Sequence, residues 1–296
     1  MRVFQDGVYV IMADQRDLNL LGKRIISIGG VPMQTVEDSL AKVTSHENIH
    51  WLEDQLPYAL LCVEFLKYYG FTNSLTSVDL DIDGLGKVTI TSTTISSNLT
   101  SVLNGKPLPL YMQNQSTNYW LSYIQANRVL YIKYNSCEES ANESFADFAN
   151  KIVACADSNQ VEKVVVDFRS NGGGNSEIVY PLLNYLQNSP FNQSGKLFIV
   201  TDWETFSSAS MDAILFKQRT NCVLVGEPTG GKPNSHGEVR AFTLPNSSLI
   251  VQYCTKYFQQ MSGDPAALFP DYDIETSAQD FMNGKDPAPD FILNYN

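Results

Sequence analysis

The chain has 296 residues, of which 43% are hydrophobic and 18% charged, and its formal net charge is −12 at pH 7. This length exceeds the roughly 100–200 residues of a typical domain, so we expect two domains with packed cores. Because the negative charge repels phosphate backbones and anionic lipid surfaces, we expect no nucleic-acid partner.

Membrane, metal and cofactor signals are absent from the sequence. It has no run approaching the roughly 18 apolar residues of a membrane-spanning helix, and its first residues lack the basic and then apolar order of a secretory signal. We therefore expect a soluble chain with no stable membrane insertion. The five cysteines form no Cys-x-x-Cys pair and the three histidines are scattered, so we expect no metal and no cofactor. Nothing in the sequence indicates an oligomeric state.

The N-terminal part has the pattern of a small α+β domain. Residues 3–11 predict two strands around an Asp-Gly turn, and residues 22–32 predict a strand, a Gly-Gly turn and a proline before a helix over Thr35–Lys42. The second pattern resembles the closing half of a PDZ domain, G-x-x-I-x-x-I-x-G-x-P. A plain β-β-α unit without a peptide groove is the alternative.

A domain boundary is expected near residue 116. Trp51–Tyr69 has apolar residues at helical spacing and is expected in the core, and Thr72–Ser116 is polar and strand-like. We therefore assign residues 1–116 to the N-terminal domain and residues 117–296 to a second, catalytic domain.

The second domain alternates buried strands with amphipathic helices, which predicts an α/β core. The expected strands are Val129–Tyr134, Val164–Phe168, Leu197–Val200 and Cys222–Val225, and the expected helices are Ser144–Ala156, Ile178–Leu186 and Ser208–Lys217. Three loops that follow these strands contain the candidate chemistry, since α/β sheets usually bind ligands at the carboxyl ends of their strands.

The first loop, Asp167–Gly174, reads D-F-R-S-N-G-G-G. Consecutive glycines leave backbone amides unshielded, so the loop is suited to stabilising a developing negative charge. A tight turn without such a role is the alternative. A phosphate-binding loop is disfavoured, because no Lys-Ser/Thr pair follows the glycines.

The second loop, T-F-S-S-A-S-M-D over Thr205–Asp212, places serines at the start of a helix. A serine there caps the helix or, with the helix dipole and free amides nearby, acts as a nucleophile. The third loop, G-E-P-T-G-G-K, ends at Lys232. A loop lysine is normally a solvated charge. To act as a base it needs a pKa about three units below its usual value of about 10.4, which desolvation in a pocket can provide.

Together and in this order, the three motifs resemble the S41 family of serine peptidases, which includes the C-terminal processing or tail-specific proteases and tricorn-like relatives. The family pattern is D-L-R-x-N-x-G-G, then S-A-S/A, then G-E-x-T-x-G-K, and the resemblance covers about Val129 to Ile274. It implies a crotonase/ClpP-like α/β core and hydrolysis of protein or peptide substrates. The late Pro-Asp before Tyr272 resembles a structural element that the family has beside its site.

The resemblance also implies roles for individual residues. The nucleophile maps to Ser208, with Ser207 as the alternative register, and the general base maps to Lys232. The oxyanion donors map to the amides of Gly173 and Ala209.

Two positions depart from the family pattern. His236 stands where processing proteases have a glutamine that orients the lysine, so we expect His236 to take that role. Tricorn-like members have a basic histidine in a Tyr-Ile-His context, and here Lys133 occupies the position, which excludes a histidine triad on that strand and leaves Lys133 as the alternative base. The spacing of 24 residues from Ser208 to Lys232 is slightly shorter than the family's.

Two other functions share these features. A catalytically inactive ligand- or peptide-binding protein on the same scaffold needs no reactive serine, and an acyl-CoA enzyme of the crotonase type needs neither Ser208 nor a buried lysine. The family resemblance suggests an extracytoplasmic location if the sequence is part of a longer chain.

Overall fold

The structure, a computed structural model, describes residues 1–91 and 98–295. The chain divides into two compact units. The first comprises Met1–Gln113 with Glu275–Asp290, and the second comprises Asn114–Ile274 with Phe291–Asn296. The fold is mixed α/β, with an antiparallel sheet in the first unit and a parallel-rich sheet in the second.

The first unit is built on a sheet in the order β1-β2-β4-β6-β7, in which β1 is an end strand. Its strands are β1 (Arg2–Phe4), β2 (Gly7–Tyr9), β3 (Met12–Ala13), β4 (Arg24–Ile28), β5 (Val31–Pro32), β6 (Ser77–Ile82), β7 (Gly86–Thr91) and β8 (Thr100–Ser101). Its helices are α1 (Met33–Leu40), α2 (Ile49–Leu60), α3 (Val63–Tyr68) and α7 (Ala278–Met282).

Several expectations for this unit are confirmed. The β1–β2 hairpin turns before Gly7, and β4 and β5 pair around the Gly-Gly turn before α1. The helical spacing over Trp51–Tyr69 corresponds to two helices, because Cys62 has an extended backbone (φ −87°, ψ 97°) that separates α2 from α3. The strand-like stretch expected over Thr72–Ser116 includes residues 92–97, which lie outside the described residues.

The return of Glu275–Asp290 to the first unit differs from the expected boundary. Phe281 packs against Phe4 with ring centroids 5.5 Å apart, and Ala278 and Leu103 complete this small buried cluster. Because the contacts join opposite ends of the chain, local sequence patterns carry no sign of them.

The second unit is built on a sheet in the order β16-β13-β12-β11-β10-β9, in which only β9 is antiparallel to its neighbour. Its strands are β9 (Tyr119–Ile124), β10 (Val129–Tyr134), β11 (Lys163–Asp167), β12 (Leu197–Thr201), β13 (Val223–Gly226), β14 (Asn234–Thr243), β15 (Ile250–Gln259) and β16 (Tyr272–Asp273). Its helices are α4 (Phe145–Ser158), α5 (Tyr180–Asn188) and α6 (Ser208–Arg219), and α8 (Pro287–Asn294) follows α7. The strands and helices expected between Val129 and Val225 are confirmed with small shifts at their ends.

The two faces of this sheet are covered differently. Alternate residues such as Ile132, Val166 and Ile199 join α4, α5 and α6 in one buried core. The opposite face carries Phe198, whose ring meets that of Tyr295 at 5.5 Å. Because side chains alternate along a strand, neighbours such as Lys133 and Tyr134 point to opposite faces.

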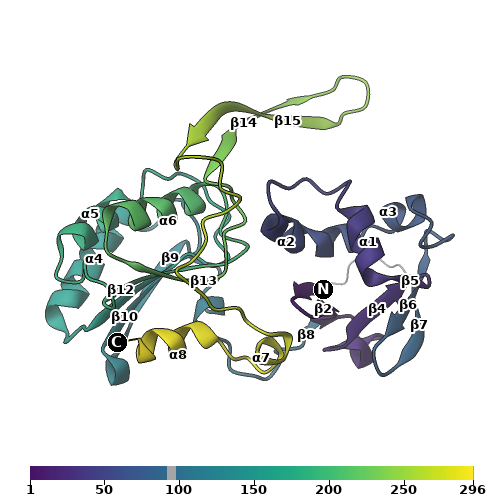
Figure 1. The fold of residues 1–296 in the computed structure, drawn as a ribbon, viewed down its shortest axis with the longest axis horizontal. Helices are drawn as coiled ribbons and strands as arrows, with labels where there is room; N and C mark the ends of the chain where they lie inside the picture. Colours follow the sequence, from purple (N-terminus) through teal and green to yellow (C-terminus); the bar gives the residue numbers. More distant parts are fainter. Residues whose placement is uncertain (92–97, 296) are drawn as a thin grey trace. The chain divides into compact units, whose positions relative to one another are not determined.

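The hairpin of β14 and β15 was not expected from the sequence. The two strands pair only with each other among the described residues and form a ribbon that projects from the second unit (Figure 1). No helix in the described ranges is long and apolar enough to cross a membrane.

Candidate active site

The three candidate loops meet at the carboxyl edge of the parallel sheet. They follow β11, β12 and β13, which are adjacent and parallel, so their ends lie at one edge. The amide of Phe206 donates to the carbonyl of Asn171 (3.0 Å), and the amide of Gly231 donates to the carbonyl of Thr205 (3.3 Å). The second loop is thus bonded to both of the others.

Two glycines allow the loops to come this close. A Cβ on Gly173 (φ +104°) would lie 2.8 Å from Cβ of Ser207 and 2.9 Å from the amide nitrogen of Ser208. A Cβ on Gly231 would lie 3.0 Å from the amide nitrogen of Ser207 and 2.5 Å from Oγ of Ser210. The first and third loops therefore both press against the start of α6.

The turn into α6 is strained at Ser207. Its φ of 52° and ψ of −125° lie outside the regions that L-residues favour, and such strain tends to cluster at functional sites. Ser207 is exposed, whereas Ser208, the first residue of α6, is only 7% exposed. Both serines thus occupy a sharp turn at a helix start.

The groups proposed for nucleophile and oxyanion donors all have partners within the chain. The hydroxyl of Ser208 donates to the carbonyl of Gly174 (2.7 Å). The amide of Gly173 donates to Oδ1 of Asn171 (2.9 Å), and the amide of Ala209 donates to the carbonyl of Phe206 (3.1 Å). An oxyanion would have to displace these acceptors to reach the two amides.

Asn171 holds the glycine loop, a role that the sequence reasoning did not assign. It is fully buried, and its Nδ2 donates to the carbonyl of Tyr134 (2.7 Å) while its Oδ1 receives the Gly173 amide. Cys137, beyond β10, clamps the same loop by donating its amide to the Gly173 carbonyl and accepting from the amide of Asn175. Asn171 lies within the first motif, D-F-R-S-N-G-G-G, and that position is the sequence signal that could have identified it.

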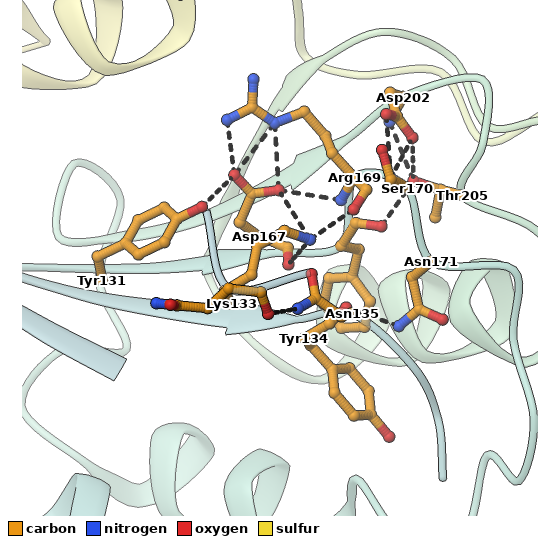
Figure 2. Close-up of polar contacts among 12 residues, drawn as sticks. Tyr131, Lys133, Tyr134, Asn135, Asp167, Arg169, Ser170, Asn171, Asp202 and Thr205 are labelled. Carbon is orange, nitrogen blue, oxygen red and sulfur yellow. Dashed lines mark hydrogen bonds and ion pairs between the residues drawn. The ribbon is translucent and has the colours of Figure 1, made fainter. Parts of the chain in front are cut away.

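A buried ion cluster fixes the base of the first loop (Figure 2). The carboxylate of Asp167 accepts from the hydroxyl of Tyr131 (2.8 Å) and from the guanidinium of Arg169 (2.6 Å), and Nζ of Lys133 lies 4.0 Å away. Lys133 also donates to the carbonyl of Arg169. Burial raises the pKa of Asp167, but the charges of Arg169 and Lys133 outweigh it, so its pKa lies below the usual value.

Asp202 and Thr205 tie the first loop to the second, as Figure 2 shows. The amide of Ser170 donates to the carboxylate of Asp202 (3.0 Å), and the hydroxyl of Thr205 lies within 3.1 Å of both Asp202 and the carbonyl of Phe168. The turn before Ser207 is therefore anchored by hydrogen bonds.

The two lysines considered as bases have different surroundings. Nζ of Lys232 pairs with Asp264 at 2.9 Å, and its side chain is 23% exposed. Lys133 is completely buried on the sheet face opposite α6, where burial lowers its pKa despite the charge of Asp167. Nothing in the sequence indicated Asp264 as a partner of Lys232.

His236, the expected orienter of Lys232, lies on β14. Its ring packs against that of the cross-strand residue Tyr257, with ring centroids 4.9 Å apart and ring planes tilted by 54°. The structure thus places His236 against Tyr257 and Lys232 against Asp264.

A second buried carboxyl lies one helical turn after Ser208. Asp212 is fully buried, receives a hydrogen bond from the thiol of Cys137 (3.5 Å) and, within the described part of the chain, leaves Oδ1 without a partner. Burial raises its pKa well above the usual value, because little offsets the cost of the charged form.

Among residues 1–91 and 98–295 no group of three His, Cys, Asp or Glu side chains could hold a metal ion.

Comparison with solved structures finds a similar fold in two structures of mature CPAF. No family model and no curated protein matches the chain. A structure of mature CPAF complexed with lactacystin is 13% identical over 98% of this chain and 80% of that chain, with a TM-score of 0.59. A second structure of mature CPAF is 12% identical over 98% and 79%, with a TM-score of 0.56. A putative S41 protease from Bacteroides fragilis is 14% identical over 93% and 71%, with a TM-score of 0.43. At these identities the likeness to the two CPAF structures concerns the fold alone.

The two buried aspartates predict opposite effects of the same substitution. Asp167→Asn removes the anion between two cations and should lower the free energy of unfolding by about 3–5 kcal/mol at pH 7. The carboxyl of Asp212 ionises readily only when the chain unfolds, and at pH 8 this favours the unfolded state. Asp212→Asn removes that effect, so it should raise the free energy of unfolding at pH 8, with the gain vanishing as the pH falls toward about 4. Urea denaturation of the wild-type chain and of both variants, at pH 7–8 and near pH 4, measures the free energies of unfolding. Equal losses of stability in the two variants at pH 7–8 would contradict this description.

Proposed function

We propose that the chain is a serine-type peptidase that cleaves protein or peptide substrates through an acyl-enzyme, with Ser208 as nucleophile and Lys232 as general base. The contact of the third loop with the start of α6 carries this proposal, because Gly231 lies against Ser207 and Ser210 and directly precedes Lys232. We also propose a crotonase/ClpP-like core for the catalytic domain, expected over residues 117–296, and a partly PDZ-like domain for residues 1–116.

The proposed reaction uses only groups of this chain and water. Lys232, as the neutral amine, takes the proton of Ser208 while the serine oxygen attacks the peptide carbonyl. The amides of Gly173 and Ala209 stabilise the oxyanion, each such donor being worth about 2.7–4 kcal/mol. Lys232 then protonates the leaving amine, and a water that it deprotonates hydrolyses the ester.

Lys232 is favoured over Lys133 by position. Ser208 starts α6, which packs on one face of the sheet, whereas Lys133 lies in the ion cluster on the opposite face. We retain His236 as the proposed orienter, which requires its ring to leave Tyr257.

The proposed reaction requires a rearrangement from the described state. The hydroxyl of Ser208 must leave the carbonyl of Gly174, and Lys232 must leave Asp264. The amides of Gly173 and Ala209 must leave Oδ1 of Asn171 and the carbonyl of Phe206. Substrate binding can supply these exchanges, since the catalytic hydrogen bonds of unliganded enzymes often form only in the complex.

The hydrogen bonds and the ion pair that these groups form within the chain favour a second candidate function. A site in which the serine, the lysine and the glycine amide already have internal partners suits a catalytically inactive peptide-binding protein on this fold. Such a protein binds peptides without cleaving them.

Cleavage of a dye-quenched, unfolded protein substrate separates the two functions. Ser208→Ala and Lys232→Met should each lower kcat by roughly a thousandfold or more, because each removes a member of the reacting unit. Ser207→Ala is the matched control, since it removes the neighbouring hydroxyl from the same turn, and it should keep kcat within about fivefold.

Thermal unfolding of the three variants establishes that each is folded. Full activity of folded Ser208→Ala would contradict the role of Ser208, and loss of activity in Ser207→Ala alone would move the nucleophile to Ser207. Absence of cleavage by the wild-type chain together with peptide binding would favour the binding protein.

A further inference from the structure

The first unit contains a groove apart from the candidate active site. Its cavity has a volume of about 440 Å³ and is lined by β1, the turn after it, β4, α1 and α2. This volume falls within the roughly 300–1,000 Å³ of typical ligand pockets. All of its lining residues belong to the first unit.

The groove has an apolar floor. Ile25, Met33, Leu52 and Leu56 line it, and each is less than 9% exposed. Such a floor suits an aliphatic chain more than a hydrated ion.

Carboxyl groups surround this floor. Glu37 and Asp38 on α1, Glu53 on α2 and Asp6 in the β1–β2 turn all line the groove. Burial raises the pKa of Glu53 to about 7, with smaller contributions from the charges of Glu275 and Glu37.

One arginine, Arg24, is also among the residues that line the groove. Its guanidinium donates to the carbonyl of Asp6 (3.1 Å) and lies 3.5 Å from the carboxylate of Asp83, the residue that follows β6. Arg24 thus forms its ion pair with Asp83, and among the described residues neither Glu37 nor Glu53 forms an ion pair with a lysine or arginine.

We propose that this groove docks a basic segment of polypeptide, with the stem of a lysine or arginine on the apolar floor and its charged head between Glu37 and Glu53. Charge complementarity selects this occupant, because the carboxylates repel a C-terminal carboxylate, a phosphate or an anionic lipid headgroup. The apolar floor and the lack of a three-ligand cluster among the described residues disfavour a metal ion. The site is independent of Ser208.

The test is fluorescence anisotropy with the full-length chain carrying Ser208→Ala, so that no peptide is cleaved. The probes are three labelled peptides: one with blocked ends and two lysines flanking a leucine, the same peptide with glutamines in place of the lysines, and one with a free C-terminal carboxylate after an apolar residue. The lysine peptide should bind about tenfold more tightly than either of the others.

Substitutions in the groove locate the binding. Glu53→Gln and Glu37→Gln should each weaken binding of the lysine peptide about three- to tenfold, and neither should destabilise the fold, since each removes a carboxyl that is costly to ionise. Glu64→Gln is the matched control, because it removes the same charge from the exposed face of α3, outside the groove, and it should leave the affinity unchanged.

Three outcomes overturn the proposal. They are absence of binding, tighter binding of the peptide with the free carboxylate, and an equal loss of affinity in Glu64→Gln, which would show attraction to the overall negative charge. A fall in the pKa of Glu53 on addition of the lysine peptide, followed by NMR, would support it independently of the variants.

Discussion

The ends of three parallel strands determine where chemistry can occur in this protein. Because β11, β12 and β13 are adjacent and run in the same direction, the loops after them must meet at one edge of the sheet. The buried carboxylate of Asp167 at the end of β11 then binds Arg169 and Tyr131 and fixes the first loop. Asn171 and Thr205 extend this order to the glycines and to the start of α6.

The strand and helix positions of the second unit could be predicted because their signals are local. The apolar run at β11 and the helical spacing in α4 need only their own residues to be recognised. The antiparallel edge strand β9, the long β14–β15 ribbon and the return of Glu275–Asp290 to the first unit depend on contacts distant in sequence or on exposed strands with mixed polarity. Sequence patterns are weak for both.

In the candidate site too, features with a local sequence signal could be predicted, and contacts between distant segments could not. Motif order indicated the three loops, and the structure shows that they are in contact. The partners of Lys232 and His236 could not be predicted, because Asp264 and Tyr257 come from segments with no motif. Asn171 does lie within the first motif, whereas Asp212 is distinguished by burial that its own sequence context does not reveal. The strain at Ser207 is likewise a property of how the glycines pack against the turn. The fold fixes the loops, and the side chains of Ser208, Asn171 and Lys232 within them bind partners of the same chain.

The central claim is that the turn into α6 presents Ser208 as a reactive nucleophile. It is tested most directly by treating the folded wild-type chain with a fluorophosphonate reagent and locating the covalent adduct by tandem mass spectrometry. The account predicts a single adduct on Ser208 that forms much more slowly in Lys232→Met. An adduct on Ser207, or no adduct on a chain shown to be folded, would contradict it.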